Sequence, residues 1–193
     1  VRGFGTWMLG ELGPAAAPAV PALALALERE GDERPGVTAQ ALAKLGPAAL
    51  PAGPALCRVL KADAPRRRWN AAIALGRLGP AGRQVALAPL RAAMADPDGR
   101  VRAQAVLALG RQKADDAETV ALLTRALSDD WPDTRALAAR ALGWLGAPAR
   151  PAVPALNGRL RDDEPRVRRE AEKALRRIQL GLASQAGPED DAQ

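Results

Sequence analysis

The residue types that carry most enzyme chemistry are scarce in this sequence. The chain has 193 residues with no histidine, no tyrosine, one cysteine and two serines, Ser128 and Ser184. Serine–histidine–aspartate triads, cysteine–histidine pairs and histidine-ligated metals all need a residue type that is missing. Cys57 follows Leu56 in an expected helix, and we interpret it as a small buried hydrophobe. We therefore expect a protein that is not an enzyme and has no catalytic residue and no cofactor.

Neighbouring aspartates are the remaining candidates for cation ligands. They stand in expected turns just before helices, where aspartate side chains commonly cap the free N–H groups. Helix capping is therefore favoured over a hard cation such as calcium, and we expect no metal. The pairs are Asp115 and Asp116, Asp129 and Asp130, and Asp162 and Asp163.

The glycines and prolines of this chain recur with a fixed period. One series of leucines, here called anchor leucines, is spaced by 33 or 34 residues: Leu9, Leu42, Leu75, Leu109, Leu142 and Leu175. Two further apolar series, which begin at Leu23 and Leu27, keep the same spacing. Three series in one register predict stacked units, none of which buries its apolar face alone.

Each unit reads as two helices joined by an acidic turn. The first helix is short and is expected to open near a proline, because a proline in the first turn removes no hydrogen bond. These prolines are Pro21, Pro54, Pro89 and Pro154. The second helix carries the anchor leucine and ends at a glycine. A glycine often follows the anchor leucine directly, where we expect a side chain to collide with the neighbouring unit: Gly10, Gly76, Gly110 and Gly143.

These patterns, VR..A..ALG.LG in the second helix and PAVPAL...L.D in the first, resemble the HEAT repeat family. The likeness is to its short bacterial type, named after phycobilisome lyases. It covers residues 1 to about 180 in six copies. It implies an all-α fold, a right-handed α–α superhelix of about six two-helix repeats over residues 1–180. The first repeat lacks its first helix, so we expect a fragment of a larger protein. Residues 181–193 read as a disordered acidic tail.

The resemblance also implies a structural ladder of arginines and aspartates along the array. The matching positions are Arg2, Arg68, Arg102, Arg135 and Arg168, with Asp96, Asp129 and Asp162. The offset Asp63 is a doubtful member. The second copy departs from the pattern with Pro35 and Arg29, and we expect a soft joint there.

A separate set of positions predicts a partner-binding surface. The resemblance places the second helices on the concave face. Residues six before, two before and two after each anchor leucine point away from the buried side. We call these the grid positions and the surface they form the grid face. The predicted partner-binding residues are Trp7, Trp69, Ile73, Arg77, Leu107, Arg111, Arg140, Trp144, Lys173 and Arg177. Tryptophan, arginine and apolar side chains together are typical of interface hot spots. Trp131, in a turn, is interpreted as a local packing or rim residue.

The sequence thus predicts a protein-interaction scaffold whose partner is an extended or helical, partly acidic segment. One alternative is a nucleic acid or another polyanion, since the net charge is +6 and the isoelectric point is about 10.6. The other is a phycobilin lyase-like subunit. Compositional bias toward arginine would explain the charge equally well. The sequence shows no signal peptide, no apolar stretch long enough to span a membrane and no evident small-molecule site, and we expect a cytoplasmic protein.

Overall fold

The computed structural model describes residues 2–29 and 36–181, and these residues form helices joined by short turns. The elements in chain order are α1 (Arg2–Glu11), η1 (Gly13–Ala19), α2 (Val20–Arg29), α3 (Val37–Leu45), η2 (Gly46–Ala52), α4 (Gly53–Val59), α5 (Pro65–Arg77), η3 (Gly79–Gly82), α6 (Arg83–Ala93), α7 (Gly99–Arg111), α8 (Ala117–Ala126), α9 (Pro132–Leu145), η4 (Ala147–Ala152), α10 (Val153–Arg159) and α11 (Pro165–Gln179), where η marks a 3-10 helix.

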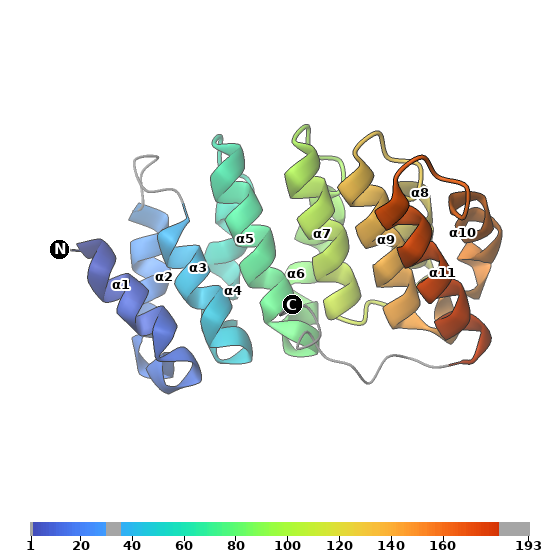
Figure 1. Cartoon of the computed structure of the whole chain (residues 1–193). Helices are drawn as coiled ribbons and strands as arrows, with labels where there is room; N and C mark the ends of the chain where they lie inside the picture. The colour runs from blue at the N-terminus through green and yellow to red at the C-terminus, as the bar shows by residue number, and fades with distance from the viewer. Residues whose placement is uncertain (1, 30–35, 182–193) are drawn as a thin grey trace.

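The helices lie in two layers (Figure 1). The second helices α1, α3, α5, α7, α9 and α11 stand side by side in one layer, and the first helices α2, α4, α6, α8 and α10 form the layer behind. The anchor leucines of α3, α5, α7 and α9 are fully buried between the layers. The predicted all-α fold, a right-handed α–α superhelix of two-helix repeats, is confirmed. The predicted boundary at residue 180 stays a prediction, and residues 182–193 lie outside the described part.

Three second helices start at a proline, and a fourth is capped by an aspartate. Pro65, Pro132 and Pro165 are the first residues of α5, α9 and α11, where a missing N–H costs no hydrogen bond. Asp98 caps α7, because its carboxylate accepts a hydrogen bond from the backbone N–H of Arg100.

The residue four positions after the anchor leucine turns the chain out of the second helix. This position has a positive φ angle in four repeats, where it is Gly13, Gly46, Gly79 or Gly146. Glycine adopts such an angle at little cost. In the remaining turn the position is Lys113, whose φ of 49° is unusual for a residue with a side chain. This one turn therefore carries local strain.

The glycine after the anchor leucine lets neighbouring second helices approach closely. A Cβ placed on Gly76 would lie 2.9 Å from Cβ of Ala108, and one on Gly143 would lie 2.9 Å from Cα of Ala174. Such contacts are too short for real carbon atoms. The expectation that a side chain here would strike the next repeat is confirmed.

The expected position of Pro89 was wrong, and Cys57 lies in the expected first helix but is less buried than expected. Pro89 lies inside α6, which begins at Arg83, and does not open the helix. A proline inside a helix leaves the carbonyl four residues earlier, here that of Val85, without its usual donor. Cys57 is half-buried, and its Sγ atom lies 3.6 Å from that carbonyl oxygen. The thiol therefore acts as a weak hydrogen-bond donor to an oxygen that Pro89 leaves unpaired.

Candidate partner-binding surface

Arginine and aspartate side chains link consecutive repeats at one end of the second helices. Arg68 donates two hydrogen bonds to Asp96, at 2.7 and 2.8 Å. Arg102 binds Asp129 in the same way at 2.8 Å, and Arg135 binds Asp162 at 2.9 Å. Each arginine also donates to carbonyl oxygens of its own turn. Because the pattern repeats at three consecutive joints, these charges hold the array together and mark no single site.

The ladder ends at the last repeat. Arg168 donates to the carbonyl oxygens of Asp162 and Asp163, but within the described part of the chain it meets no carboxylate. The Arg2 side chain and Pro35 lie outside the described residues, so the expected soft joint stays a prediction.

The aspartate pairs act as caps. Asp116 accepts a hydrogen bond from the backbone N–H of Thr119 at the start of α8, and it also meets Arg83 and Arg91. Burial raises the pKa of Asp116, but the hydrogen bonds from Thr119 and the charge of Arg91 outweigh it and leave the pKa below its usual value. Among the described residues, no cluster of three histidine, cysteine or acidic side chains could hold a metal ion.

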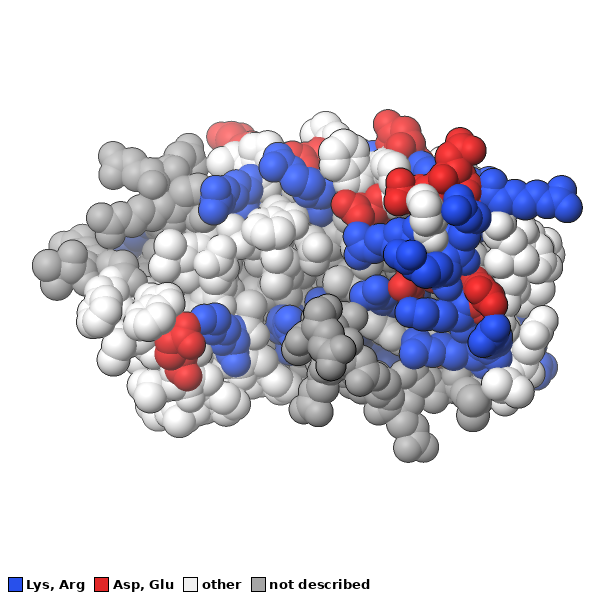
Figure 2. All heavy atoms as spheres, in the orientation of Figure 1, with Lys and Arg blue, Asp and Glu red and all other residues white. Residues whose placement is uncertain are grey.

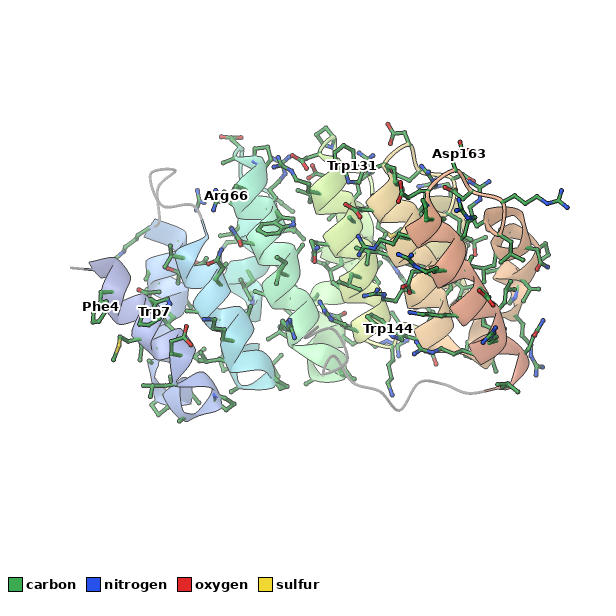
Figure 3. All side chains as sticks on the ribbon, viewed as in Figure 1. Phe4, Trp7, Arg66, Trp131, Trp144 and Asp163 are labelled. Atoms are coloured by element: carbon green, nitrogen blue, oxygen red, sulfur yellow. The ribbon has the colours of Figure 1, made fainter. Side chains whose placement is uncertain are left out.

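The three tryptophans at grid positions differ in exposure. Trp7 is half exposed, and its ring centroid lies 5.9 Å from that of Phe4 on the same helix (Figure 3). Trp69 and Trp144 are partly buried and pack against the core. Trp144 lies over Gly110, with Cε3 3.0 Å from the point where a Cβ would stand. Each of these rings therefore keeps some surface for a partner, but two of them also stabilise the array.

Trp131 packs against the start of α7, which agrees with its interpretation as a local packing or rim residue. A Cβ placed on Gly99 at the start of α7 would stand 2.8 Å from its ring. Trp131 stands at the N-terminus of α9, whereas Trp144 lies near the C-terminus of the same helix (Figure 3).

The expectation that Leu107 is an exposed grid residue was wrong. Leu107 on α7 is only 6% exposed and belongs to the core, whereas Ile73 on α5 remains partly accessible. The residue two before an anchor leucine lies against the residue five before the next one, as the 3.2 Å hydrogen bond from Gln40 to Asn70 shows. At the joint of α7 and α9 these two positions hold Leu107 and Leu137, and both are buried. Leu107 is therefore a stacking residue.

The same pair of positions accounts for Arg140, which was expected to meet acidic groups of a partner. Its guanidinium lies 3.1 Å from the carboxylate of Glu170 on α11, and the ammonium group of Lys173 lies 3.6 Å from the same carboxylate. Burial raises the pKa of Glu170, but the hydrogen bond and charge of Arg140 outweigh it and hold the pKa below its usual value. Glu170 was missed from the sequence. The sequence does hold a signal for Glu170. It stands five residues before Leu175, and the position opposite it in the preceding repeat is Arg140.

Positive charge on the grid face gathers toward the C-terminal end. Figure 2 shows it over α9 and α11, while the opposite end is mostly uncharged. Arg169 and Lys173 on α11 are exposed and Arg177 is partly buried. Arg169 and Arg177 form no ion pair with any described residue. Among the remaining grid residues, Arg77 is exposed and Arg111 is partly buried, whereas Lys44 pairs with Glu11 across α1 and α3.

A hollow of about 470 Å³ lies beside the first helices and offers little chemistry. Cys57, Arg68 and Asp96 are among the residues that line it. Arg68 and Asp96 are bonded to each other. Burial raises the pKa of the Cys57 thiol, so it stays protonated near neutral pH and is a poor nucleophile. No helix within the described ranges is long and apolar enough to cross a membrane.

Stacked two-helix repeats with a regular joint define an α-solenoid, a class built for extended contact surfaces. Known proteins place the chain within that class. The family model for HEAT repeats matches residues 20–110 and 87–176. The chain therefore belongs to the HEAT repeat family, as predicted.

Solved structures show the same fold at low sequence identity. The crystal structure of an engineered protein is 22% identical with a TM-score of 0.72, covering 93% of this chain and 91% of its own. A designed armadillo repeat protein in complex with the peptide (KR)4 is 16% identical with a TM-score of 0.70, covering 91% of each chain. The Escherichia coli protein YibA is 17% identical with a TM-score of 0.51, covering 91% of this chain and 76% of its own. No curated protein matches the chain.

Proposed function

We propose that this protein is a non-catalytic scaffold that binds an extended or helical segment of another protein across the grid face. The observation that carries the proposal is the set of partly exposed side chains Trp7 on α1, Trp69 and Ile73 on α5, and Trp144 on α9. It leads to Arg169 and Arg177 on α11, which form no ion pair with any described residue. Large aromatic side chains beside arginine are the usual anchors of protein interfaces.

The uneven charge of the grid face determines which end of the ligand lies toward α1 and which lies toward α11. Apolar side chains of the ligand lie toward α1 and α5, and carboxylates lie toward Arg169 and Arg177 on α11. The designed armadillo protein holds a basic peptide. A surface of the same fold with exposed arginines calls for the opposite charge.

The spacing of the helices sets the length of the ligand. Neighbouring helices pack about 8–10 Å apart, so Trp69 on α5 and Trp144 on α9 are separated by about 20 Å. An extended peptide rises about 3.3 Å per residue, so about six residues link the two tryptophan contacts. The acidic residues follow after these six.

A library of displayed 12-residue peptides, selected on the immobilised protein, tests the proposal. We expect selected peptides to combine apolar and acidic residues and to bind Trp69→Ala at least fivefold more weakly. Trp131→Ala is the matched control, because it removes a tryptophan that packs on Gly99 at the opposite end of α9 from Trp144, and it should leave binding unchanged. Circular dichroism checks that both variants fold. Peptides that bind wild type and Trp69→Ala equally would exclude the grid face.

The second candidate is a polyanion such as DNA, favoured by the net charge of +6 and the cations of α11. It predicts that the logarithm of the affinity for a DNA duplex falls with the logarithm of the salt concentration, by about 0.9 for each phosphate neutralised. A flat salt response, or no binding in physiological salt, would exclude this candidate.

A further inference from the structure

Three arginines and a tryptophan form one edge of the grid face. They stand two residues after the anchor leucines, at the C-terminal ends of α5, α7, α9 and α11, and we call them the edge row: Arg77, Arg111, Trp144 and Arg177. These four helices lie side by side in that order (Figure 1). Arg77 is exposed, and the other three side chains are partly buried. The edge row therefore crosses the joints between repeats.

The same position of the first two repeats shows what a cation in this row binds. Glu11 on α1 and Lys44 on α3 each stand two residues after an anchor leucine, and they form an ion pair across the joint. A carboxylate that lies along this edge is thus within reach of the cation on the neighbouring second helix.

The rest of the edge row lacks such carboxylates. The helices α5 and α7 contain several arginines but no acidic residue. Arg77 and Arg177 form no ion pair with any described residue. Clustered charges of one sign create a potential that attracts the opposite charge, so the edge row favours an acidic segment.

The chain itself contains a segment of this chemistry. Residues 178–193 include three acidic residues and no lysine or arginine. The three are consecutive, and we call Glu189, Asp190 and Asp191 the acidic segment. Its first residue follows Gly181, the last residue that the structure describes, by eight positions.

The acidic segment is long enough in reach to lie on the edge row. Gly181 follows Arg177 by four residues, so the chain leaves α11 at the same edge of the grid face. Eight residues span at most about 26–29 Å. Neighbouring helices pack about 8–10 Å apart, so Arg111, two helices away from α11, lies about 20 Å from Arg177. The segment can therefore reach both arginines and the Trp144 ring between them.

We propose that the acidic segment binds along the edge row of its own chain, with its carboxylates beside Arg111 and Arg177. Because both belong to one chain, the segment competes at an effective concentration of about a millimolar, the value typical of short links. Each exposed ion pair is weak by itself, so binding uses several pairs at once. Such contacts are screened by salt.

The consequence for ligands rests on the proposed function. That function directs the carboxylates of a ligand toward Arg169 and Arg177 on α11. The acidic segment takes up part of the same site, so an acidic ligand must displace it before it binds fully. The segment thus acts as an internal competitor that selects for ligands with additional apolar contacts.

Paramagnetic broadening in NMR spectra tests the docking without any ligand. A nitroxide label on Ala192→Cys, in a Cys57→Ala background of the full 193-residue chain, stands beside the acidic segment. Trp131 and Trp144 stand at opposite ends of α9, about 20 Å apart, and their indole N–H signals report on the two ends. We expect the label to broaden the Trp144 signal strongly and the Trp131 signal much less.

The matched control keeps the label and neutralises the acidic segment by Glu189→Gln, Asp190→Asn and Asp191→Asn. The Trp144 signal should then sharpen, and it should also sharpen in wild type at a salt concentration of about 1 M. Equal broadening of the two tryptophans, or a Trp144 signal that neutralisation leaves unchanged, would overturn the proposal. Broadening that a labelled chain causes only in a second copy would overturn binding within one chain.

Calorimetry with one selected acidic peptide tests the competition. The neutralised variant should bind the peptide at least threefold more tightly than wild type. Glu28→Gln with Glu118→Gln removes two acidic charges from α2 and α8 in the other layer, and this control should bind as wild type does. Equal affinities for wild type and the neutralised variant would overturn the competition. The NMR experiment uses no peptide, so a failure of the proposed function is distinguishable from a failure of the docking.

Discussion

Trp144 on α9 lies across Gly110 on α7, with its Cε3 atom 3.0 Å from the point where a Cβ on Gly110 would stand. The same point is 2.7 Å from Cβ of Ala141. Because Gly110 has no side chain, both Ala141 of the core and Trp144 of the proposed binding surface can pack against its backbone.

Gly110→Ala should therefore destabilise the protein although alanine favours helices. The added methyl group collides with Ala141 and Trp144, and overpacking of this kind costs about 1–3 kcal/mol. Gly158→Ala is the matched control, because a Cβ on Gly158 in α10 meets nothing within 4 Å. Urea unfolding should show a lower free energy of unfolding for Gly110→Ala and an equal or higher one for Gly158→Ala. Equal values for the two variants would refute the close approach.

Gln112→Leu should stabilise the protein. Gln112 is fully buried, and its Oε1 atom accepts no hydrogen bond from any described residue. Four of the five equivalent positions hold leucine, and a buried acceptor without a partner costs about 1–3 kcal/mol. The lost hydrogen bond to the carbonyl of Leu75 offsets part of the gain, so we expect a rise of about 1 kcal/mol. The reverse change Leu145→Gln at the same position of α9 should lower the stability, and a loss in Gln112→Leu would be contrary evidence.

Lys113→Gly should also stabilise the protein, by about 1 kcal/mol. Its φ of 49° is unfavourable for a residue with a side chain and is tolerated by glycine. Lys113→Ala keeps the strain and serves as the control, because it removes only the charged end of the side chain. Thermal unfolding should show a higher midpoint for the glycine variant alone. Similar midpoints for both variants would place the effect in the side chain.

The ladder predicts that arginines with the same sequence context differ in their importance. Arg102→Gln leaves the partly buried carboxylate of Asp129 without its bidentate partner, and we expect a loss of about 1–3 kcal/mol. Arg168→Gln removes an arginine that meets no described carboxylate, so the loss should stay below about 1 kcal/mol. Comparable losses in chemical unfolding would show that the pairs contribute little beyond the hydrogen bonds within each turn.

Acid should destabilise the protein through the cap of α7 and the carboxylates of the joints. The hydrogen bond from Arg100 lowers the pKa of Asp98 from 3.8 to about 2. Burial raises the pKa values of Asp129 and Asp162, but hydrogen bonds from Arg102 and Arg135 outweigh it and leave both below their usual value.

A carboxyl group whose pKa is lower in the folded state stabilises the protein above its unfolded pKa, and this contribution is lost as the pH falls through the folded value. The free energy of unfolding should therefore be steady from pH 7 to about 5 and decrease between about pH 4 and 2. Arg102→Gln should weaken this decrease, because it removes the main cause of the lowered pKa of Asp129. A stability that does not change below pH 4 would contradict the description of the joints.

The repeat was predictable from the sequence because its leucines, glycines and prolines recur with one spacing, and helical periodicity then assigns the buried side. The contacts between neighbouring second helices were harder to predict. Whether a position two before the anchor leucine reaches solvent depends on the residue opposite it in the next repeat. Leu107 is buried and Arg140 is paired with Glu170 for this reason. Rotation and distance between two helices are tertiary properties that the pattern of one helix does not contain.

The proposed function is tested most directly by isothermal titration calorimetry with one selected peptide and two variants of equal charge. Arg169→Glu with Arg177→Glu changes the exposed end of the grid face, whereas Arg125→Glu with Arg150→Glu makes the same change on α8 and η4. We expect the first pair to weaken binding at least tenfold and the second to change it less than twofold. Equal losses in both variants, or no loss in the first, would contradict a binding site on the second helices.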